Sequence, residues 1–164
     1  MAGDFDRFVG PLDPAALIVT AAVEGERSGC LVGFQAQCSI DPPLLAVWVS
    51  HANHTHGVAA RATHLGVHVL SDDERELAEL FGGTTGDEVD KFERCRWTPG
   101  AFDVPLLDDC PRRGVFEVAA RHDVGGDHDL FVLAPVDITT GSTGDTALRI
   151  GAMDIEPGHP VPPE

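Results

Sequence analysis

The stretch Gln35-Ala36-Gln37-Cys38-Ser39-Ile40-Asp41-Pro42-Pro43-Leu44-Leu45-Ala46-Val47-Trp48-Val49 decides how this chain folds. Its last six residues form an apolar run, which is typical of a strand that is buried on both faces or that faces a partner subunit. Asp41-Pro42-Pro43 predicts a turn before that run, because proline ends regular structure. We therefore expect a strand that ends at Ser39, a turn, and a central strand over residues 44–49.

A β-hairpin is expected on the N-terminal side of this stretch. Residues 15–23 are apolar and β-branched in their middle, and Glu24-Gly25-Glu26 is a turn sequence. A second strand is predicted over residues 29–37.

Two helices and one strand are expected on its C-terminal side. Residues 53–60 predict a helix capped by Asn53 or Thr55, and residues 65–70 alternate as a strand does. Residues 71–81 predict a second helix, with Ser71 at its N-cap, acidic residues in its first turn and Gly82-Gly83 at its end.

The last third of the chain predicts more strands. Residues 115–124 and 130–136 form a pair around Gly125-Gly126-Asp127, and residues 147–150 add a short strand. The tail from Pro157 on is expected to be extended or to wrap a neighbour. About six strands with two or three short helices favour a mainly β fold, a small antiparallel Greek-key-like barrel, over a doubly wound sheet.

Length and charge narrow the function classes. The chain has 164 residues, 17.4 kDa and a net charge of -16, so we expect one domain over 1–164, with a core of about 13–150 and an extended tail over 151–164. Such a charge opposes binding to nucleic acid or to an anionic membrane.

No apolar run is long enough for a bilayer, and the acidic N-terminus is unlike an export signal, so a cytoplasmic location is expected. Cys30, Cys38, Cys95 and Cys110 are expected to be free thiols.

Common catalytic and metal motifs are absent from the sequence. His51, His54 and His56 lie within six residues, yet no H-E-x-x-H and no C-x-x-C accompanies them, so a polar loop or helix start is expected and no metal site. No G-x-S-x-G, G-x-G-x-x-G or P-loop occurs either. The many carboxylates assign no catalytic pair.

Several ordered motifs resemble the flavin reductase-like family, and they cover about residues 13–150. The family carries the same turn before an apolar strand, a Ser-x-x-x-x-Thr stretch, an alternating strand, a short helix ending in Phe, and Asp-Lys-Phe, Pro-x-Leu and Gly-Asp-His motifs. The matching segments here are Ser39 to Pro43, Ser50 to Thr55, 65–70, 77–81, Asp90-Lys91-Phe92, Pro105-Leu106-Leu107 and Gly126-Asp127-His128.

The resemblance implies an FMN-binding split barrel that transfers hydride from NADH or NADPH to flavin, with FAD as an alternative flavin. It also implies a homodimer, with residues 44–49 and the tail at the interface, and a partner monooxygenase that would use the reduced flavin. Two alternatives stay open: an FMN-binding oxidoreductase with another donor or acceptor, such as a deazaflavin, and a flavin-binding or flavin-sensing protein without turnover.

The resemblance also implies the residues of the site. The phosphate end would be formed by the turn at 50–55, with Ser50, Asn53 and Thr55 as hydroxyl and amide groups and His51 and His54 beside them, aided by the following helix N-terminus. The ring would lie along the backbone of Leu31, Val32, Gly33, Phe34, Gln37, Cys38 and Ser39. Lys91 would neutralise phosphate or the ring's N1 side, or be solvated, and Phe81 would pack in the core or on the ring.

His128 resembles the family histidine near the face where nicotinamide stacks, and it would shuttle a proton or position substrate, or be a simple turn residue. This chain departs from its relatives at Leu31, Phe34, Gln35 and Ala36, where many have Thr, Ser or Asn. Ring contacts would therefore fall mostly to the backbone.

Overall fold

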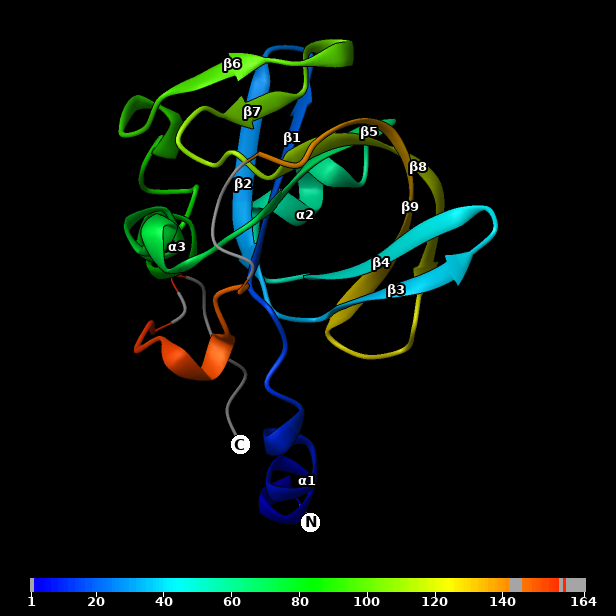
Figure 1. Cartoon of the computed structure of the whole chain (residues 1–164), viewed down its shortest axis with the longest axis vertical. Coiled ribbons are helices and arrows are strands. Elements are labelled where there is room, and N and C mark those ends of the chain that lie inside the picture. Colours follow the sequence, from blue (N-terminus) through cyan, green and yellow to red (C-terminus); the bar gives the residue numbers. More distant parts are fainter. Residues whose placement is uncertain (1, 142–145, 157, 159–164) are drawn as a thin grey trace.

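The computed structural model describes residues 2–141, 146–156 and 158, and its main feature is one curved antiparallel sheet (Figure 1). The seven strands follow the order β2-β1-β5-β8-β9-β4-β3. The two ends of the sheet approach each other where β2 contacts β4. The Trp48 amide donates to the Phe34 carbonyl at 2.9 Å, which extends the pairing of β3 with β4 by one residue. The fold is thus the mainly β, split-barrel architecture that the sequence predicts. The strands are β1 (Leu17–Val23), β2 (Glu26–Val32), β3 (Gln35–Ile40), β4 (Pro43–Ser50), β5 (His64–Val69), β8 (Arg113–Asp123) and β9 (His128–Thr139), with a separate pair of β6 (Trp97–Pro99) and β7 (Pro105–Leu107).

The described residues include three short α-helices beside the sheet: α1 (Ala2–Val9), α2 (His54–Ala59) and α3 (Arg75–Gly83). Helix α2 packs on β1 and β2 at one end of the barrel, α3 lies beside β2, and α1 projects away from the barrel (Figure 1). No helix in the described part of the chain is long and apolar enough to cross a membrane. Short 3-10 turns occur at Gly10–Leu12, Asp72–Glu74, Lys91–Glu93, Ala101–Asp103 and Ile150–Ala152.

The local sequence signals for helix starts are confirmed. Ser71 accepts a hydrogen bond from the Asp73 amide, and Glu74 reaches back to the Ser71 amide at 2.7 Å, which completes a capping box. The first turn after Ser71 is a 3-10 turn, and α3 continues from it. Asn53, rather than the alternative Thr55, caps α2 by accepting from the Thr55 amide at 3.0 Å.

The predicted strand over residues 29–37 is wrong in its second half. The hairpin of β1 and β2 forms around Gly25, whose φ is +84°, but β2 ends at Val32. The chain then leaves β1 through Gly33 and Phe34, and β3 pairs with β4 at the opposite end of the sheet. The predicted central strand, β4, lies between β3 and β9 and is therefore next to the sheet edge.

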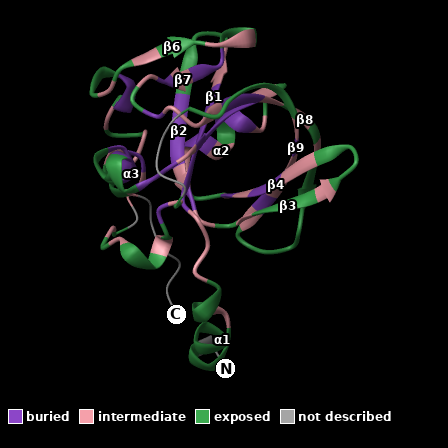
Figure 2. Ribbon diagram, in the orientation of Figure 1, coloured by how far each residue is buried: buried purple, intermediate pink, exposed green. Residues whose placement is uncertain are grey.

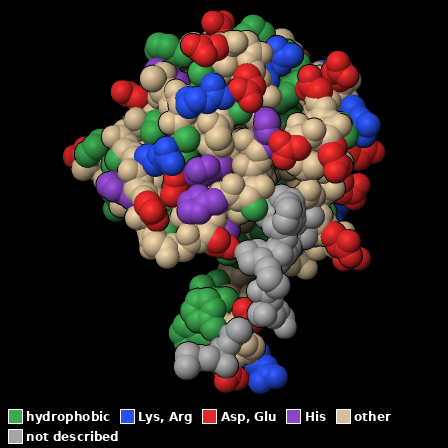
Figure 3. Space-filling model, turned by 180° about the vertical axis from the view of Figure 1, so that it is seen from behind, with side chains coloured by type: hydrophobic (Ala, Val, Ile, Leu, Met, Phe, Trp, Pro, Cys, Tyr) green, Lys and Arg blue, Asp and Glu red, His purple; other side chains and the backbone are tan. Residues whose placement is uncertain are grey.

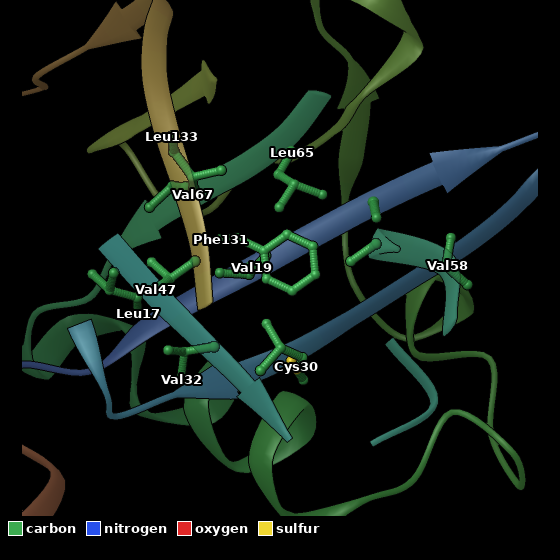
Figure 4. Close-up of a cluster of buried hydrophobic side chains, with 13 residues drawn as sticks. Leu17, Val19, Cys30, Val32, Val47, Val58, Leu65, Val67, Phe131 and Leu133 are labelled. Atoms are coloured by element: carbon green, nitrogen blue, oxygen red, sulfur yellow. The ribbon is translucent and has the colours of Figure 1, made fainter. Parts of the chain in front are cut away.

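The hydrophobic core has two parts. Inside the barrel, aliphatic side chains of β1, β2, β4 and β5 surround Phe131 of β9 (Figure 4). The second part lies between the outer side of β1 and α3, and includes Ile18, Phe81 and Leu107. Figure 2 shows buried segments along β1 and β2, which contribute to the core. Burial of these side chains provides the main driving force for the fold.

One fully buried histidine links the sheet to the β6–β7 pair. His68 of β5 contacts the Ile18 carbonyl through Nδ1 at 3.1 Å and accepts from the Leu107 amide at Nε2 at 2.9 Å. Nδ1 must therefore carry the proton of a neutral ring. Burial lowers the pKa of His68 to about 4, with a smaller lowering effect from the charge of Arg113.

The predicted strand over residues 147–150 is absent. Arg149 makes only an isolated bridge to Ala15, while the Leu148 backbone bonds to both Ala16 and Leu70. Residues 150–156 do not extend freely either, because Ile150, Met153 and Ile155 pack against the second core cluster. The tail predicted from Pro157 lies outside the described residues except for Gly158, whose amide donates to the Gly82 carbonyl at 3.0 Å.

Candidate functional site

A cleft of about 360 Å³ lies between the end of β2, the β4–α2 turn, the start of β9 and the C-terminal segment. Its volume falls within the range of small-molecule and cofactor sites. Most of its lining is apolar, and a few polar groups gather at one end. The lining residues are Cys30, Leu31, Val32, Gly33, Phe34, Trp48, Val49, Ser50, Asn53, Phe81, Gly82, His128, Ile150, Met153 and Ile155.

The free edge of β2 supplies backbone donors and acceptors to the cleft. Among the residues that the structure describes, β2 pairs only with β1, and its other edge has no strand neighbour. The Gly29 carbonyl points to that free edge, since it accepts from Lys91 Nζ at 3.0 Å. Alternate residues of an antiparallel strand direct their N–H and C=O groups to the same side, so Leu31 presents both groups to the cleft.

Apolar side chains form the walls. The ring of Phe34 lies 5.1 Å from the ring of His128 at a tilt of 54°, and Phe34 is 58% exposed. Ile150 covers Gly33 so closely that a Cβ at that position would be 3.0 Å from its side chain. Glycine at 33 thus admits Ile150, where the sequence suggested an approach by the ligand itself.

The polar end of the cleft lies at the β4–α2 turn. Ser50 ends β4, and its hydroxyl oxygen accepts weakly from the Ala52 amide at 3.3 Å. Asn53 uses its side-chain oxygen to cap α2, which leaves the amide nitrogen available. A serine hydroxyl and an asparagine amide can therefore donate to an anionic or polar group in the cleft.

His128 faces this end from β9, directly opposite Ser50 in the strand register. Its Nδ1 lies 2.6 Å from Asp127 Oδ1, and its side chain is mostly buried. The hydrogen bond from His128 lowers the pKa of the Asp127 carboxyl. Asp127 thereby orients the imidazole and leaves Nε2 for a ligand.

Eight of the predicted site residues line the cleft: Leu31, Val32, Gly33, Phe34, Ser50, Asn53, Phe81 and His128. Phe81 does so from the core, because it is 1% exposed and its ring meets Phe92 edge to face.

The structure places Gln37, Cys38 and Ser39 elsewhere. They lie on the largely exposed strand β3, which begins after Phe34 and pairs with β4. The Gln37 side-chain amide donates to the Ser39 carbonyl. The expectation that the ring runs along these three residues does not fit a cleft that ends at Phe34.

The side chains of Thr55 and Lys91 make hydrogen bonds to other residues of the protein. The Thr55 hydroxyl is buried 2.8 Å from the Ser28 hydroxyl. Lys91 Nζ donates to the carbonyls of Gly29 and Phe81, and burial lowers its pKa. Lys91 lines a separate hollow of about 290 Å³ between Arg27 to Gly29 of β2 and the loop at 86–90.

The two predicted histidines of the turn also point away from the cleft. His54 Nδ1 bonds to Asp87 at 2.7 Å, and His51 Nε2 bonds to Asp129 at 2.8 Å. Both side chains therefore serve contacts outside the cleft lining.

Sequence reasoning missed the C-terminal wall, Ile150, Met153 and Ile155, together with Cys30, Trp48, Val49 and Gly82. The apolar spacing in 150–155 was the available signal, but the neighbouring glycine and prolines suggested a free tail. The remaining residues adjoin segments that were predicted correctly.

FMN fits this arrangement. Its ring system has two apolar faces and a polar edge, which correspond to the apolar walls and to the free Leu31 backbone groups. Its phosphate would suit the Ser50 and Asn53 end, where an acidic protein must use neutral donors.

The comparisons with known proteins agree with this chemistry. The chain is 28% identical over 151 residues to an NADH:riboflavin 5'-phosphate oxidoreductase of Streptomyces pristinaespiralis, covering 92% of this chain and 84% of that protein. It is 30% identical over 130 residues to the FMN reductase (NADH) SmoA of Agrobacterium fabrum, covering 78% of this chain and 71% of that protein.

A solved structure shows the same fold. A flavin reductase domain protein of Arthrobacter sp. FB24 superposes with a TM-score of 0.83 and 25% identity, covering all of this chain and 98% of that one. The family model described as flavin reductase like domain matches residues 13–152. The chain therefore belongs to the flavin reductase like family.

Proposed function

We propose that this protein binds FMN in the cleft and catalyses the reduction of flavin by a reduced nicotinamide nucleotide, with NADH as the first donor to test. The observation that carries the proposal is the cleft itself, which combines the free edge of β2, apolar walls and the mostly buried imidazole of His128. The relatives named above as NADH-dependent FMN reductases support the same choice.

Bound FMN would accept hydride at its ring, so the protein has little covalent chemistry of its own to perform. Leu31 binds the polar ring edge through its backbone, and Ser50 and Asn53 bind the phosphate. Phe34, Trp48 and Ile150 exclude water from the ring faces. His128, whose Nδ1 donates to Asp127, presents Nε2 to the cleft and would position the nicotinamide.

We also propose a homodimer as the working form. Helix α1 projects from the barrel with Phe5 and Phe8 exposed, and Leu12 follows it, also exposed, so the chain presents an apolar surface that a second copy could cover (Figures 1 and 3). Residues 44–49 of β4, the segment that the sequence predicts at the interface, stay a second candidate, because pairing with β3 and β9 occupies only the edges of the strand.

A cytoplasmic location and a partner monooxygenase complete the proposal. All four cysteines are free thiols, as is usual in a reducing compartment. Because the cleft is open and lacks a cation of its own, we expect FMN to exchange, and a separate oxygenase could then consume reduced flavin.

Steady-state NADH oxidation at increasing FMN concentration tests the function. A rate that saturates with both NADH and FMN supports a reductase with exchanging flavin. FMN binding without NADH or NADPH oxidation would favour another donor, such as a deazaflavin, or a flavin sensor.

A further inference from the structure

Outside the cleft, two histidines and one carboxylate meet at the end of the barrel. His51 Nε2 lies 2.8 Å from Asp129 Oδ1, and His56 Nε2 lies 2.8 Å from Asp129 Oδ2. One donor atom from each of the three residues lies within 4.8 Å of the others. Two imidazoles and one carboxylate are a donor set that Zn²⁺ and related divalent transition metals prefer.

The spacing of these atoms is close to that of a metal site. Ligand atoms around tetrahedral Zn²⁺ lie about 3.3 Å apart, as follows from zinc–ligand bonds of about 2.0 Å. The 2.8 Å contact between His51 Nε2 and Asp129 Oδ1 would widen by about 0.5 Å to admit the ion. His56 Nε2, now 2.8 Å from Oδ2, would give up that hydrogen bond and turn to the ion. Each imidazole would bind through Nε2 as a neutral ring with its proton on Nδ1.

Rigid elements hold all three ligands in place. His51 follows β4, and its amide donates to the Asp127 carbonyl at 2.8 Å. His56 lies on α2, and Asp129 lies on β9 opposite Val49, on the face that carries the core. Because these elements are already packed together, the donors need little ordering to bind an ion.

The site is buried on one side and open on the other. Asp129 is 3% exposed, whereas the His51 side chain is 41% exposed, so an ion could enter from solvent and keep water as a further ligand. Figure 3 shows histidine side chains gathered on the surface of the molecule seen from behind. The negative net charge of the protein also favours a cation.

Arg121 is the charged group that opposes a metal here. Its guanidinium donates twice to Asp129 Oδ2, at 2.6 and 2.9 Å, and leaves Oδ1 to His51. These two hydrogen bonds orient the carboxylate, in the way that outer partners orient metal-binding carboxylates.

We propose that His51, His56 and Asp129 bind a divalent transition-metal ion, with Zn²⁺ as the probe, through two imidazole nitrogens and Asp129 Oδ1. The ion would connect β4, α2 and β9 at the end of the barrel. The site is separate from the flavin cleft, and the proposal does not depend on flavin reduction.

Zn²⁺ titration of tag-free, flavin-free protein by calorimetry tests this proposal, with equilibrium dialysis as the stoichiometric check. His51→Gln and His56→Gln each remove one ligand. His122→Gln is the matched control, because His122 is exposed beside Arg121 and lies outside the cluster.

We expect one Zn²⁺ per chain in the wild type and in the control, and an affinity at least about tenfold lower in both ligand variants. Co²⁺ should give a visible d–d absorption band that both ligand variants lose. Equal binding by all four proteins, or no stoichiometric binding by the wild type, would overturn the proposal. If His56→Gln fails to fold, the half-exposed His51→Gln decides the result, since its ring is not part of the core.

Discussion

Neighbouring residues at the end of β4 and at the start of β9 belong to two regions, a ligand cleft and a cluster of polar side chains. Ser50 and His128 face the cleft, whereas the next residues in sequence, His51 and Asp129, meet in the polar cluster at the end of the barrel. The alternation of side chains along a strand produces this division for Asp129 and His128. One pair of strands therefore supports both a ligand cleft and a polar anchor.

The two regions differ in how they use polar groups. The cleft offers backbone groups, a hydroxyl, an amide and one imidazole, while the buried ionic and hydrogen-bonded side chains lie outside it. His68, Thr55 and Asp129 belong to this second set, which we call the frame. Variants of the frame should change stability, and variants of the cleft should change turnover.

Protonation of His68 in acid should lower the free energy of unfolding by more than any of the substitutions described below. Its folded pKa of about 4 lies below the ordinary 6.5, so the unfolded chain takes up a proton that the folded one excludes. This stability is complete above pH 6.5 and falls as the pH drops toward 4, by about 3 kcal/mol in all.

Urea unfolding across that pH interval measures the loss, and His68→Gln should flatten the slope because glutamine does not titrate. Asp129, whose pKa is lowered, loses its contribution only as the pH falls below the usual carboxyl range. An unchanged slope in His68→Gln would remove His68 from this role.

Asp129→Asn should destabilise the frame by about 2 kcal/mol. The change removes the shared anionic acceptor of His51, His56 and Arg121, although partial exposure of His51 and Arg121 limits the cost. Urea unfolding at neutral pH measures it. Asp127→Asn is the control, since Asp127 is exposed and its loss should cost little. Equal stability of the two variants would contradict the account.

His128→Ala should lower reductase turnover about tenfold, which corresponds to about 1.4 kcal/mol, while FMN affinity and stability change little. The variant loses the imidazole that faces Phe34 across the cleft. Stopped-flow reduction of bound flavin by NADH measures the step, with His122→Ala as a control. A turnover equal to that of the wild type would take His128 out of the site.

Thr55→Val should cost about 1 kcal/mol of stability, because it leaves the buried Ser28 hydroxyl without its partner. FMN affinity should change less than about twofold, because Thr55 does not line the cleft. Thr55→Ser keeps the hydroxyl and serves as the control. Weaker FMN binding with unchanged stability would instead place Thr55 at the phosphate, as the family resemblance first suggested.

Local sequence signals predicted much of the fold. Ser71 with Glu74, Asn53 before α2, and the glycine turn at Gly25 each encode a hydrogen bond or backbone angle within a few residues. Their predictions hold because the interaction is complete within the segment.

The division between cleft and frame could not be predicted in this way. Asp129 lies 78 residues from His51, and Ile150 reaches Gly33 from the far end of the chain. The break between β2 and β3 also depends on the pairing of β3 with β4, at the opposite end of the sheet from β2. Such contacts depend on tertiary packing, which no local pattern of residues contains.

An anaerobic titration of the purified protein with FMN, then NADH, and then NADPH on a second sample, tests whether this protein is a flavin reductase. The visible absorption band of oxidised flavin is followed throughout. We expect FMN to bind and its band to bleach on addition of a nicotinamide nucleotide, which also identifies the donor. A protein that binds no FMN would contradict the assignment of the cleft, and binding without bleaching by either nucleotide would contradict the proposed reaction.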